Sequence, residues 1–287
     1  MTLNLGRHAY SDGALLIMAI VNRTPDSFYD RGATYGFDQA LDRVAEVVGQ
    51  GAEIVDIGGV KAAPGDEVDA DEEIRRTVDF VAAVRSAYPD LVISVDTWRH
   101  EVAREVCRAG ADLLNDAWGG HDPRLAEVAA EFDAALVCTH AGGVAPRTRP
   151  HRISYSDVMV DIIARTVGLA ERAAAIGVDR SRIMIDPGHD FGKNTWHSLE
   201  ATRRLSEMVE TGWPVLVSLS NKDFIGETLD LPLDERLLGT LSATAVCAWQ
   251  GASVFRAHNV AETRQVLDMV AAIRGTNPPR RALRGLA

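Results

Sequence analysis

Apolar residues along this chain form short runs that alternate with longer stretches of helical spacing. The first run, residues 15–21, is continuously apolar and ends at Asn22, just before the turn-forming residues 24–27. Such a run is typical of a strand that is covered on both faces, as in a parallel sheet. The next stretch, residues 38–50, has the apolar spacing of a helix and stops at Gly51. The pattern therefore predicts a strand, a polar loop and a helix.

The same unit recurs to the end of the chain. The further predicted strands are residues 54–57, 91–96, 113–115, 135–140, 183–186, 215–218 and 253–257. The further predicted helices are residues 71–88, 101–109, 124–132, 158–176, 198–211, 233–250 and 260–274. Eight such units predict an α/β fold of the (β/α)8 TIM-barrel type, with an open doubly wound sheet as the main rival.

We expect one domain with short ends. Residues 1–13 form an N-terminal segment, residues 14–275 hold the repeated units, and residues 276–287 form a polar C-terminal tail. The longest non-periodic insert, residues 141–154, is rich in Gly, Arg and Pro. Long loops of this kind often carry function, so this insert is a candidate functional loop.

Composition narrows the classes of function. The 287 residues carry a formal net charge of -11, which opposes a general nucleic-acid or anionic-membrane surface. No apolar stretch has the length of a membrane span, and we expect neither export nor membrane insertion. The three cysteines, Cys107, Cys138 and Cys247, are far apart and form no disulfide framework or C-x-x-C metal motif. This usage favours the reducing cytoplasm.

Seven of the eight predicted strands end near residues that can bind or react. These residues are Asn22, Asp96, Asn115, His140, Asp186, Ser220, Lys222, Arg256 and His258. The C-terminal ends of parallel strands meet at one mouth of a barrel, so we expect these side chains to converge there. Taken singly, a strand-end Asp or Asn is more often a turn former or a helix cap than a ligand contact. The complete set at one face favours a binding site.

The strand-end residues divide into two chemical groups. One group supplies carboxylates and an amide for a flat, amino-substituted heterocycle: Asp96, Asn115 and Asp186. The other supplies an amide and two potential cations for a phosphate or pyrophosphate, with Mg2+ as a companion: Asn22, Arg256 and His258. Lys222 could reach either group.

Short motifs follow one another at these strand ends. They are Asn22 with Thr24-Pro25-Asp26-Ser27-Phe28, Ser94-Val95-Asp96-Thr97, Asn115-Asp116, Asp186-Pro187-Gly188, Ser220 with Lys222, and Arg256 with His258. Together they resemble dihydropteroate synthase over about residues 15–275. The resemblance implies a (β/α)8 barrel and a homodimer formed through the later helices. It also implies a reaction in which 6-hydroxymethyl-7,8-dihydropterin pyrophosphate is joined to p-aminobenzoate with loss of pyrophosphate.

The resemblance assigns a role to each strand-end residue. The residues that resemble the pterin contacts are Asp96, Asn115, Asp186 and Lys222. Of these, the expected catalytic residues are Lys222, Asp96 and Asp186. The residues that resemble the pyrophosphate and Mg2+ site are Asn22, Arg256 and His258. Within this second set, Asn22 is the expected ligand of the Mg2+ cofactor.

The chain departs from the family pattern on the side that would hold p-aminobenzoate. The pattern Glu-Ser-Thr-Arg-Pro-Gly of the second loop is replaced by Val60-Lys61-Ala62-Ala63-Pro64-Gly65. The threonine hydroxyl and the arginine guanidinium of that loop are therefore missing. Lys61 restores a charge but not the planar fork of an arginine. Further differences are Arg23 for Val, Thr139 for Met and Asn221 for Arg.

Three functions agree with these residues. The favoured hypothesis is a divergent family member that binds a pterin or pterin pyrophosphate, with little or no condensation with p-aminobenzoate. The first alternative is an active dihydropteroate synthase in which Arg23 and Lys61 replace the missing groups. The second is a pterin-binding or folate-binding domain of the methyltransferase type. Such a domain has no pyrophosphate to hold, so it fits Arg256 and His258 less well.

Overall fold

Eight parallel strands curve into a barrel in the computed structural model, which describes residues 2–24, 36–61, 67–148 and 153–284. The strands are β3 (Leu16–Asn22), β4 (Ile54–Gly58), β5 (Val92–Asp96), β6 (Leu113–Asp116), β7 (Ala135–Thr139), β8 (Ile183–Asp186), β9 (Leu216–Ser218) and β10 (Val254–Ala257). Their order in the sheet is β8-β7-β6-β5-β4-β3-β10-β9. A bridge between Ile185 and Val215 joins the two edges. The predicted (β/α)8 barrel is confirmed.

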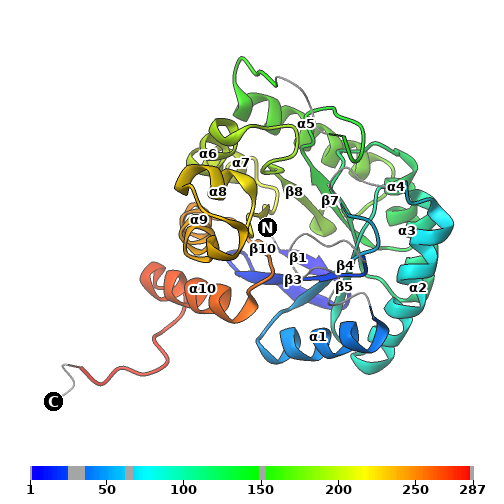
Figure 1. The fold of residues 1–287 in the computed structure, drawn as a ribbon, viewed down its shortest axis with the longest axis horizontal. Helices are drawn as coiled ribbons and strands as arrows, with labels where there is room; N and C mark the ends of the chain where they lie inside the picture. The colour runs from blue at the N-terminus through cyan, green and yellow to red at the C-terminus, as the bar shows by residue number, and fades with distance from the viewer. Residues whose placement is uncertain (1, 25–35, 62–66, 149–152, 285–287) are drawn as a thin grey trace.

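Helices form a ring around the strands (Figure 1). They are α1 (Phe37–Gly49), α2 (Ala70–Ala87), α3 (His100–Ala109), α4 (Arg124–Glu131), α5 (Val158–Ala175), α6 (Thr195–Arg203), α7 (Leu205–Val209), α8 (Asp223–Leu229), α9 (Leu237–Gln250) and α10 (Val260–Arg274), with 3-10 turns η1 (Arg180–Arg182) and η2 (Leu233–Glu235). None of the helices in the described ranges has the length and apolar character needed to cross a bilayer.

Alternation along each strand separates two apolar layers. In β7, Leu136 and Cys138 pack outward in the large core between sheet and helices. Ala135 and Val137 belong instead to a smaller cluster inside the barrel. Successive side chains of a strand point to opposite faces, so Thr139 continues the inward series of β7.

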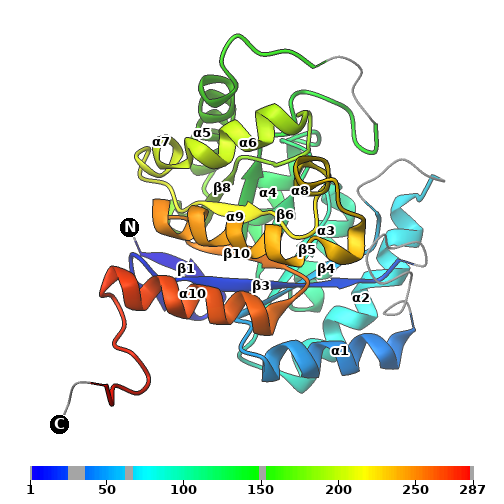
Figure 2. The same cartoon turned by 60° about the vertical axis from the view of Figure 1, so that its left-hand side comes forward.

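The first residues of the chain form a hairpin that the hydrophobic pattern does not predict. β1 (Leu3–Leu5) pairs antiparallel with β2 (His8–Tyr10). Leu3 and Leu5 join the cluster inside the barrel. Figure 2 shows the hairpin strand β1 near the N-terminus. It lies at the end of the barrel where β3 begins, opposite to the end toward which the β3 arrow points. Strands of three residues are too short to produce a periodic pattern, which explains why this plug was missed.

Two predicted helices are interrupted in the structure. The helix expected over residues 198–211 is divided into α6 and α7 at Arg204, which forms ion pairs with Asp157, Glu200 and Glu207. The helix expected over residues 233–250 begins as η2 and continues as α9. In both cases a break of one residue lies inside an otherwise helical apolar pattern, and periodicity alone does not resolve it.

Helix α8 was missed because it has only seven residues and contains Gly226. A Cβ on Gly226 would lie 2.3 Å from the guanidinium carbon of Arg236. Glycine therefore lets Arg236 pack against this helix, where its guanidinium bonds to the carbonyl of Asn221 and to Asp223. This packing orders the segment that follows Lys222.

Replacing Leu5 with alanine tests the hairpin as a plug of the barrel. Leu5 is completely buried, so Leu5→Ala should lower the free energy of unfolding by about 2–5 kcal/mol in chemical denaturation. The matched control is Leu283→Ala, because Leu283 is 65% exposed. Equal stability of the two variants would contradict a packing role for the hairpin.

Candidate functional site

A cavity opens at the C-terminal end of the barrel, and every strand of the barrel contributes to its lining. Five of the seven predicted site residues line it: Asn22, Asp96, Asn115, Asp186 and Arg256. The other strands supply Gly58 from β4, Thr139 from β7 and Ser218 from β9. Strand-end residues distant in sequence are therefore brought together at one mouth, as the strand pattern predicted.

The cavity rests on a polar layer inside the barrel, directly above the apolar interior cluster. In β4, the inward positions are Ile54, then Asp56 and then Gly58. The carboxylate of Asp56 is completely buried. It accepts hydrogen bonds from the Ser94 hydroxyl at 2.6 Å and from the Asn115 amide at 3.2 Å. These bonds fix the orientation of the Asn115 side chain at the cavity floor.

Arg256 connects three strands through its guanidinium. Its Nε lies 2.6 Å from Asp56 Oδ2, and its Nη2 lies 3.2 Å from Asp96 Oδ2. One cation therefore neutralises two carboxylates across the barrel interior. Asp56 is a site residue that the sequence interpretation missed, because it lies within a short apolar run. The available signal was its charge, since an acidic residue in a fully covered strand needs a partner.

Burial makes Asp96 a carboxyl with an unusual proton affinity. Desolvation raises the pKa of Asp96 from its ordinary value of 3.8 to about 7, and the negative charge of Asp56 acts in the same direction. The positive charge of Arg256 opposes this rise. Desolvated carboxyls of this kind are common at binding and catalytic sites, since a ligand cation can replace the lost solvation.

Asp186 and Lys222 are two buried groups of opposite charge near the cavity. Burial raises the pKa of Asp186 and lowers that of Lys222, while their mutual attraction favours both charged forms. Asp186 accepts the backbone N–H of Gly188 at 2.7 Å. Lys222 lies outside the cavity lining and donates to the His189 carbonyl, with its Nζ 4.8 Å from the centre of the Phe191 ring. Phe191 itself lines the cavity.

His258 also lies beside the lining rather than in it. Its Nδ1 is 2.9 Å from the Ser220 hydroxyl, and its backbone N–H donates to the same oxygen at 3.2 Å. The side chain is 5% exposed. The Ser220 hydroxyl therefore fixes the ring orientation of His258 at the end of β10, next to Arg256.

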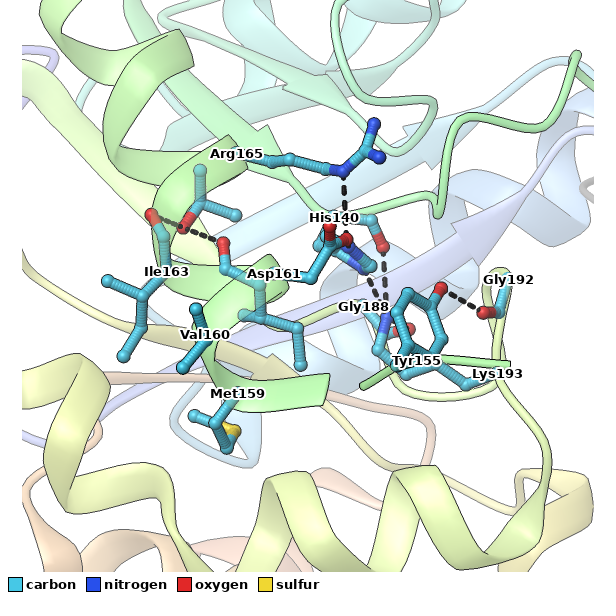
Figure 3. Close-up of polar contacts among 12 residues, drawn as sticks. His140, Tyr155, Met159, Val160, Asp161, Ile163, Arg165, Gly188, Gly192 and Lys193 are labelled. Atoms are coloured by element: carbon cyan, nitrogen blue, oxygen red, sulfur yellow. Dashed lines mark hydrogen bonds and ion pairs between the residues drawn. The ribbon is translucent and has the colours of Figure 1, made fainter. Parts of the chain in front are cut away.

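His140 was expected at the mouth, and that expectation was wrong. The residue follows the inward-facing Thr139, so its side chain points outward, and it is completely buried. Its Nε2 lies 2.8 Å from Asp161 on α5, and Arg165 donates to the same carboxylate oxygen at 2.8 Å. Figure 3 shows His140, Asp161 and Arg165 in this arrangement. Burial lowers the pKa of His140 to about 4, so the ring is neutral at pH 7.

Lys193 joins His140 to the loop after β8 (Figure 3). Its Nζ lies 2.6 Å from His140 Nδ1 and 3.0 Å from the carbonyl oxygens of both Gly188 and Phe191. Burial lowers the pKa of Lys193 well below its ordinary value, and the negative charge of Asp186 acts in the opposite direction. A Cβ on Gly188 would lie 2.1 Å from the His140 carbonyl oxygen. The two loops thus pack backbone against backbone and hold Phe191 in the cavity wall.

The residues that differ from the family pattern have distinct positions. Lys61 lines the cavity. Arg23 is only 8% exposed and packs with its guanidinium carbon 5.6 Å from the Phe37 ring centre and 5.0 Å from that of Phe80. It is absent from the described lining of the cavity. Residues 62–66 of the altered second loop, like residues 25–35 of the first, lie outside the described ranges.

Asn221 does not restore the arginine of the family pattern. Its backbone has a φ of 56°, a left-handed conformation that asparagine adopts more readily than most residues. The side chain is 2% exposed, and its Oδ1 accepts a hydrogen bond from the Thr240 hydroxyl of α9 at 3.3 Å. Position 221 therefore serves the packing between the β9 end and α9, away from the cavity.

Comparisons with known proteins show the family to which this chain is similar. The model of a family described as "Pterin binding enzyme" matches residues 18–258. A Mycobacterium leprae protein named inactive dihydropteroate synthase 2 is 59% identical, over 95% of this chain and 95% of its own. A dihydropteroate synthase of Bacillus subtilis is 37% identical, over 90% of this chain and 88% of its own.

A solved structure extends the agreement to three dimensions. The Yersinia pestis dihydropteroate synthase with a sulfonamide drug complex matches with a TM-score of 0.90 and 33% identity, over 96% of this chain and 100% of that chain. Sequence and structure are thus similar over nearly the whole length. The chain belongs to the dihydropteroate synthase family of pterin-binding enzymes.

Proposed function

We propose that this protein binds pterin pyrophosphate in the cavity at the C-terminal end of the barrel, with little or no condensation with p-aminobenzoate. The observation that carries the proposal is the set of Asp96, Asn115, Asp186 and Arg256 around one cavity, with Lys61 as the one described cation from the altered loops in its lining. The three polar side chains and Arg256 match a flat heterocycle with an anionic substituent. The altered loops affect the part of the site that would hold p-aminobenzoate.

Asp96 is paired with a guanidinium before any ligand arrives. A pterin carries a guanidine-like edge, which offers a carboxylate the same pair of N–H donors as an arginine. The ligand edge would therefore compete with Arg256 for Asp96, whose Oδ2 lies 3.2 Å from Arg256 Nη2. Asp56 keeps its 2.6 Å contact with Arg256 Nε and would retain the side chain at the site. Pterin binding would thus leave one edge of the guanidinium available to the pyrophosphate.

The pyrophosphate would lie near Asn22, Arg256 and His258. Among the described residues at the mouth, Asn22 offers one neutral oxygen ligand, and Asp56 and Asp96 are already paired with Arg256. Mg2+ often keeps several waters and binds through few protein oxygens plus substrate phosphates, so this donor set fits a metal held mainly by the pyrophosphate. Bound Mg2+ would neutralise charge on the leaving group. Arg256 would contribute a second positive charge.

Condensation would be impaired because the altered loops lack groups that the family pattern has near the pyrophosphate and the acceptor. The reaction separates charge as pyrophosphate leaves, and each missing donor to such charge costs about 10²–10³ in rate. Arg23 packs against two phenylalanines and is absent from the described lining. Asn221 has no positive charge, and its side chain bonds to Thr240. Neither position therefore supplies the missing arginine. The relative from Mycobacterium leprae is itself named inactive. An active synthase remains the alternative because Lys61 lines the cavity.

We propose that the protein forms a homodimer through α9 and α10. Five apolar side chains on these two helices are exposed: Leu238, Val246, Trp249, Met269 and Ile273. An apolar face of this kind favours burial against a second copy, in line with the family resemblance.

The three cysteines are free, buried thiols, which supports the reducing cytoplasm as the compartment.

Replacing the cavity carboxylates tests pterin binding. Asp96→Asn and Asp186→Asn should each weaken the binding of 6-hydroxymethyl-7,8-dihydropterin pyrophosphate by about 10–100-fold in calorimetric titration, since each removes a charge-assisted hydrogen bond. Both variants should still melt cooperatively. The matched control is Asp42→Asn on the exposed side of α1, which should bind like the wild type. Unchanged affinity in both cavity variants would make these carboxylates structural.

Turnover separates the divergent binder from an active synthase. With Mg2+, pterin pyrophosphate and p-aminobenzoate, pyrophosphate release should be at least about 10²–10³-fold slower than for the Bacillus subtilis enzyme assayed in parallel, because donors to the leaving charge are missing. A comparable rate would establish the alternative function. In that case Lys61→Ala should abolish the activity, whereas an unaffected Lys61→Ala variant would show that Lys61 does not compensate.

Charge on the α9 and α10 face tests the dimer. The double variant Leu238→Glu and Trp249→Glu should sediment as a monomer, because burying two carboxylates in an apolar interface is unfavourable. Val160→Glu, at a site on α5 that is 62% exposed, is the control and should sediment like the wild type. A wild-type monomer, or a double variant that stays dimeric, would contradict this interface.

A further inference from the structure

One polar group in the cavity wall lacks a partner. The hydroxyl Oγ1 of Thr139 is buried and makes no hydrogen bond within the described part of the chain. The residue is 2% exposed and lines the same cavity as Asn115 and Asp186. Buried hydroxyls nearly always have a hydrogen-bond partner, so an unpaired one within a binding cavity marks a place for a ligand atom.

Strand geometry directs Thr139 into the barrel. Val137 belongs to the interior cluster and Cys138 to the outer core, so Thr139 returns to the interior. Its register partner on β8 is Asp186. The methyl carbon Cγ2 lies 3.1 Å from the position of a Cβ on Gly188, so this methyl packs against the turn after β8. The Thr139 side chain is thereby held next to the Asp186 carboxylate.

The two neighbouring groups have different hydrogen-bonding capacities. An ionised Asp186 can only accept, whereas the Thr139 hydroxyl can donate one hydrogen bond and accept others. A ligand edge that satisfies both therefore carries an N–H group beside a ring nitrogen or carbonyl oxygen. Amino-substituted pyrimidinone rings have this arrangement. A methionine at this position, as in the family pattern, would offer neither the hydroxyl donor nor the same space.

We propose that Thr139 is a specificity-determining ligand contact, whose hydroxyl donates to a heteroatom of the bound heterocycle next to the ring N–H that Asp186 accepts. This inference rests on the proposed pterin binding. It adds a hydroxyl contact to those of Asp96, Asn115 and Asp186. It also explains why a buried hydroxyl lacks a partner in a wall where Asn115 and Asp186 are both hydrogen-bonded.

Three proteins test the role of the hydroxyl. Thr139→Val keeps the shape and removes the hydroxyl, while Thr139→Ser keeps the hydroxyl and removes the methyl. With 6-hydroxymethyl-7,8-dihydropterin pyrophosphate and Mg2+ in calorimetric titration, Thr139→Val should bind about tenfold more weakly than the wild type, and Thr139→Ser within about twofold of it. Without ligand, Thr139→Val should melt about 2 °C higher than the wild type, because an unpaired buried hydroxyl is gone.

The opposite signs of the two readouts separate ligand contact from a structural role. A purely structural hydroxyl would lower the melting temperature of Thr139→Val and leave its affinity unchanged, which would overturn the inference. Equal weakening by valine and serine would assign the effect to the side-chain shape and would also overturn it. A wild type that fails to bind the probe removes the proposed function and this contact together, whereas wild-type binding with unaffected Thr139→Val removes the contact alone.

Discussion

The guanidinium of Arg256 holds the polar interior of this barrel together. It lies between the completely buried carboxylate of Asp56 and the carboxylate of Asp96, on strands that are not its neighbours in the sheet. Two acidic groups in a desolvated layer would repel one another without a cation between them. Asp56 in turn fixes Ser94 and Asn115. The geometry of the cavity floor therefore depends on one charge, and this charge is also suited to an anionic ligand.

The site has a floor of strand-end residues and a rim of loops. The floor residues stand on strand ends whose lower positions fill the barrel with apolar side chains, closed from below by Leu3 and Leu5. The rim consists of loops, and Lys61, one of the differences from the synthase pattern, lies there. Loops tolerate such changes because little of the core depends on them. Binding of the heterocycle and chemistry on the acceptor can therefore diverge independently in this fold.

The eight strands could be predicted from the sequence because their apolar runs are short, regular and separated by turn signals. The strand ends also located Asn22, Asp96, Asn115, Asp186 and Arg256 correctly at one cavity. Residue type alone did not show which side chains face the barrel interior. The alternation of side chains along each strand decides this. It turns His140 outward, and it turns Asp56 inward from the middle of an apolar run.

Short elements, and side chains placed by tertiary contacts, could not be predicted in the same way. The hairpin strands β1 and β2 have three residues each, and α8 has seven, so none spans enough residues to produce a period. The position of Arg23 depends on the ring of Phe37 in α1 and the ring of Phe80 in α2. Both rings are distant from Arg23 in the sequence. Whether a cation next to Asn22 faces the cavity is decided by such tertiary contacts and not by its place in the motif.

The most direct test of this account is a crystal structure of the protein with 6-hydroxymethyl-7,8-dihydropterin pyrophosphate and Mg2+. The account predicts the heterocycle between Asp96 and Asp186, with Arg256 released from Asp96, still in contact with Asp56 and turned toward the pyrophosphate. A ligand bound elsewhere, or a bound heterocycle with the Arg256–Asp96 pair intact, would contradict it.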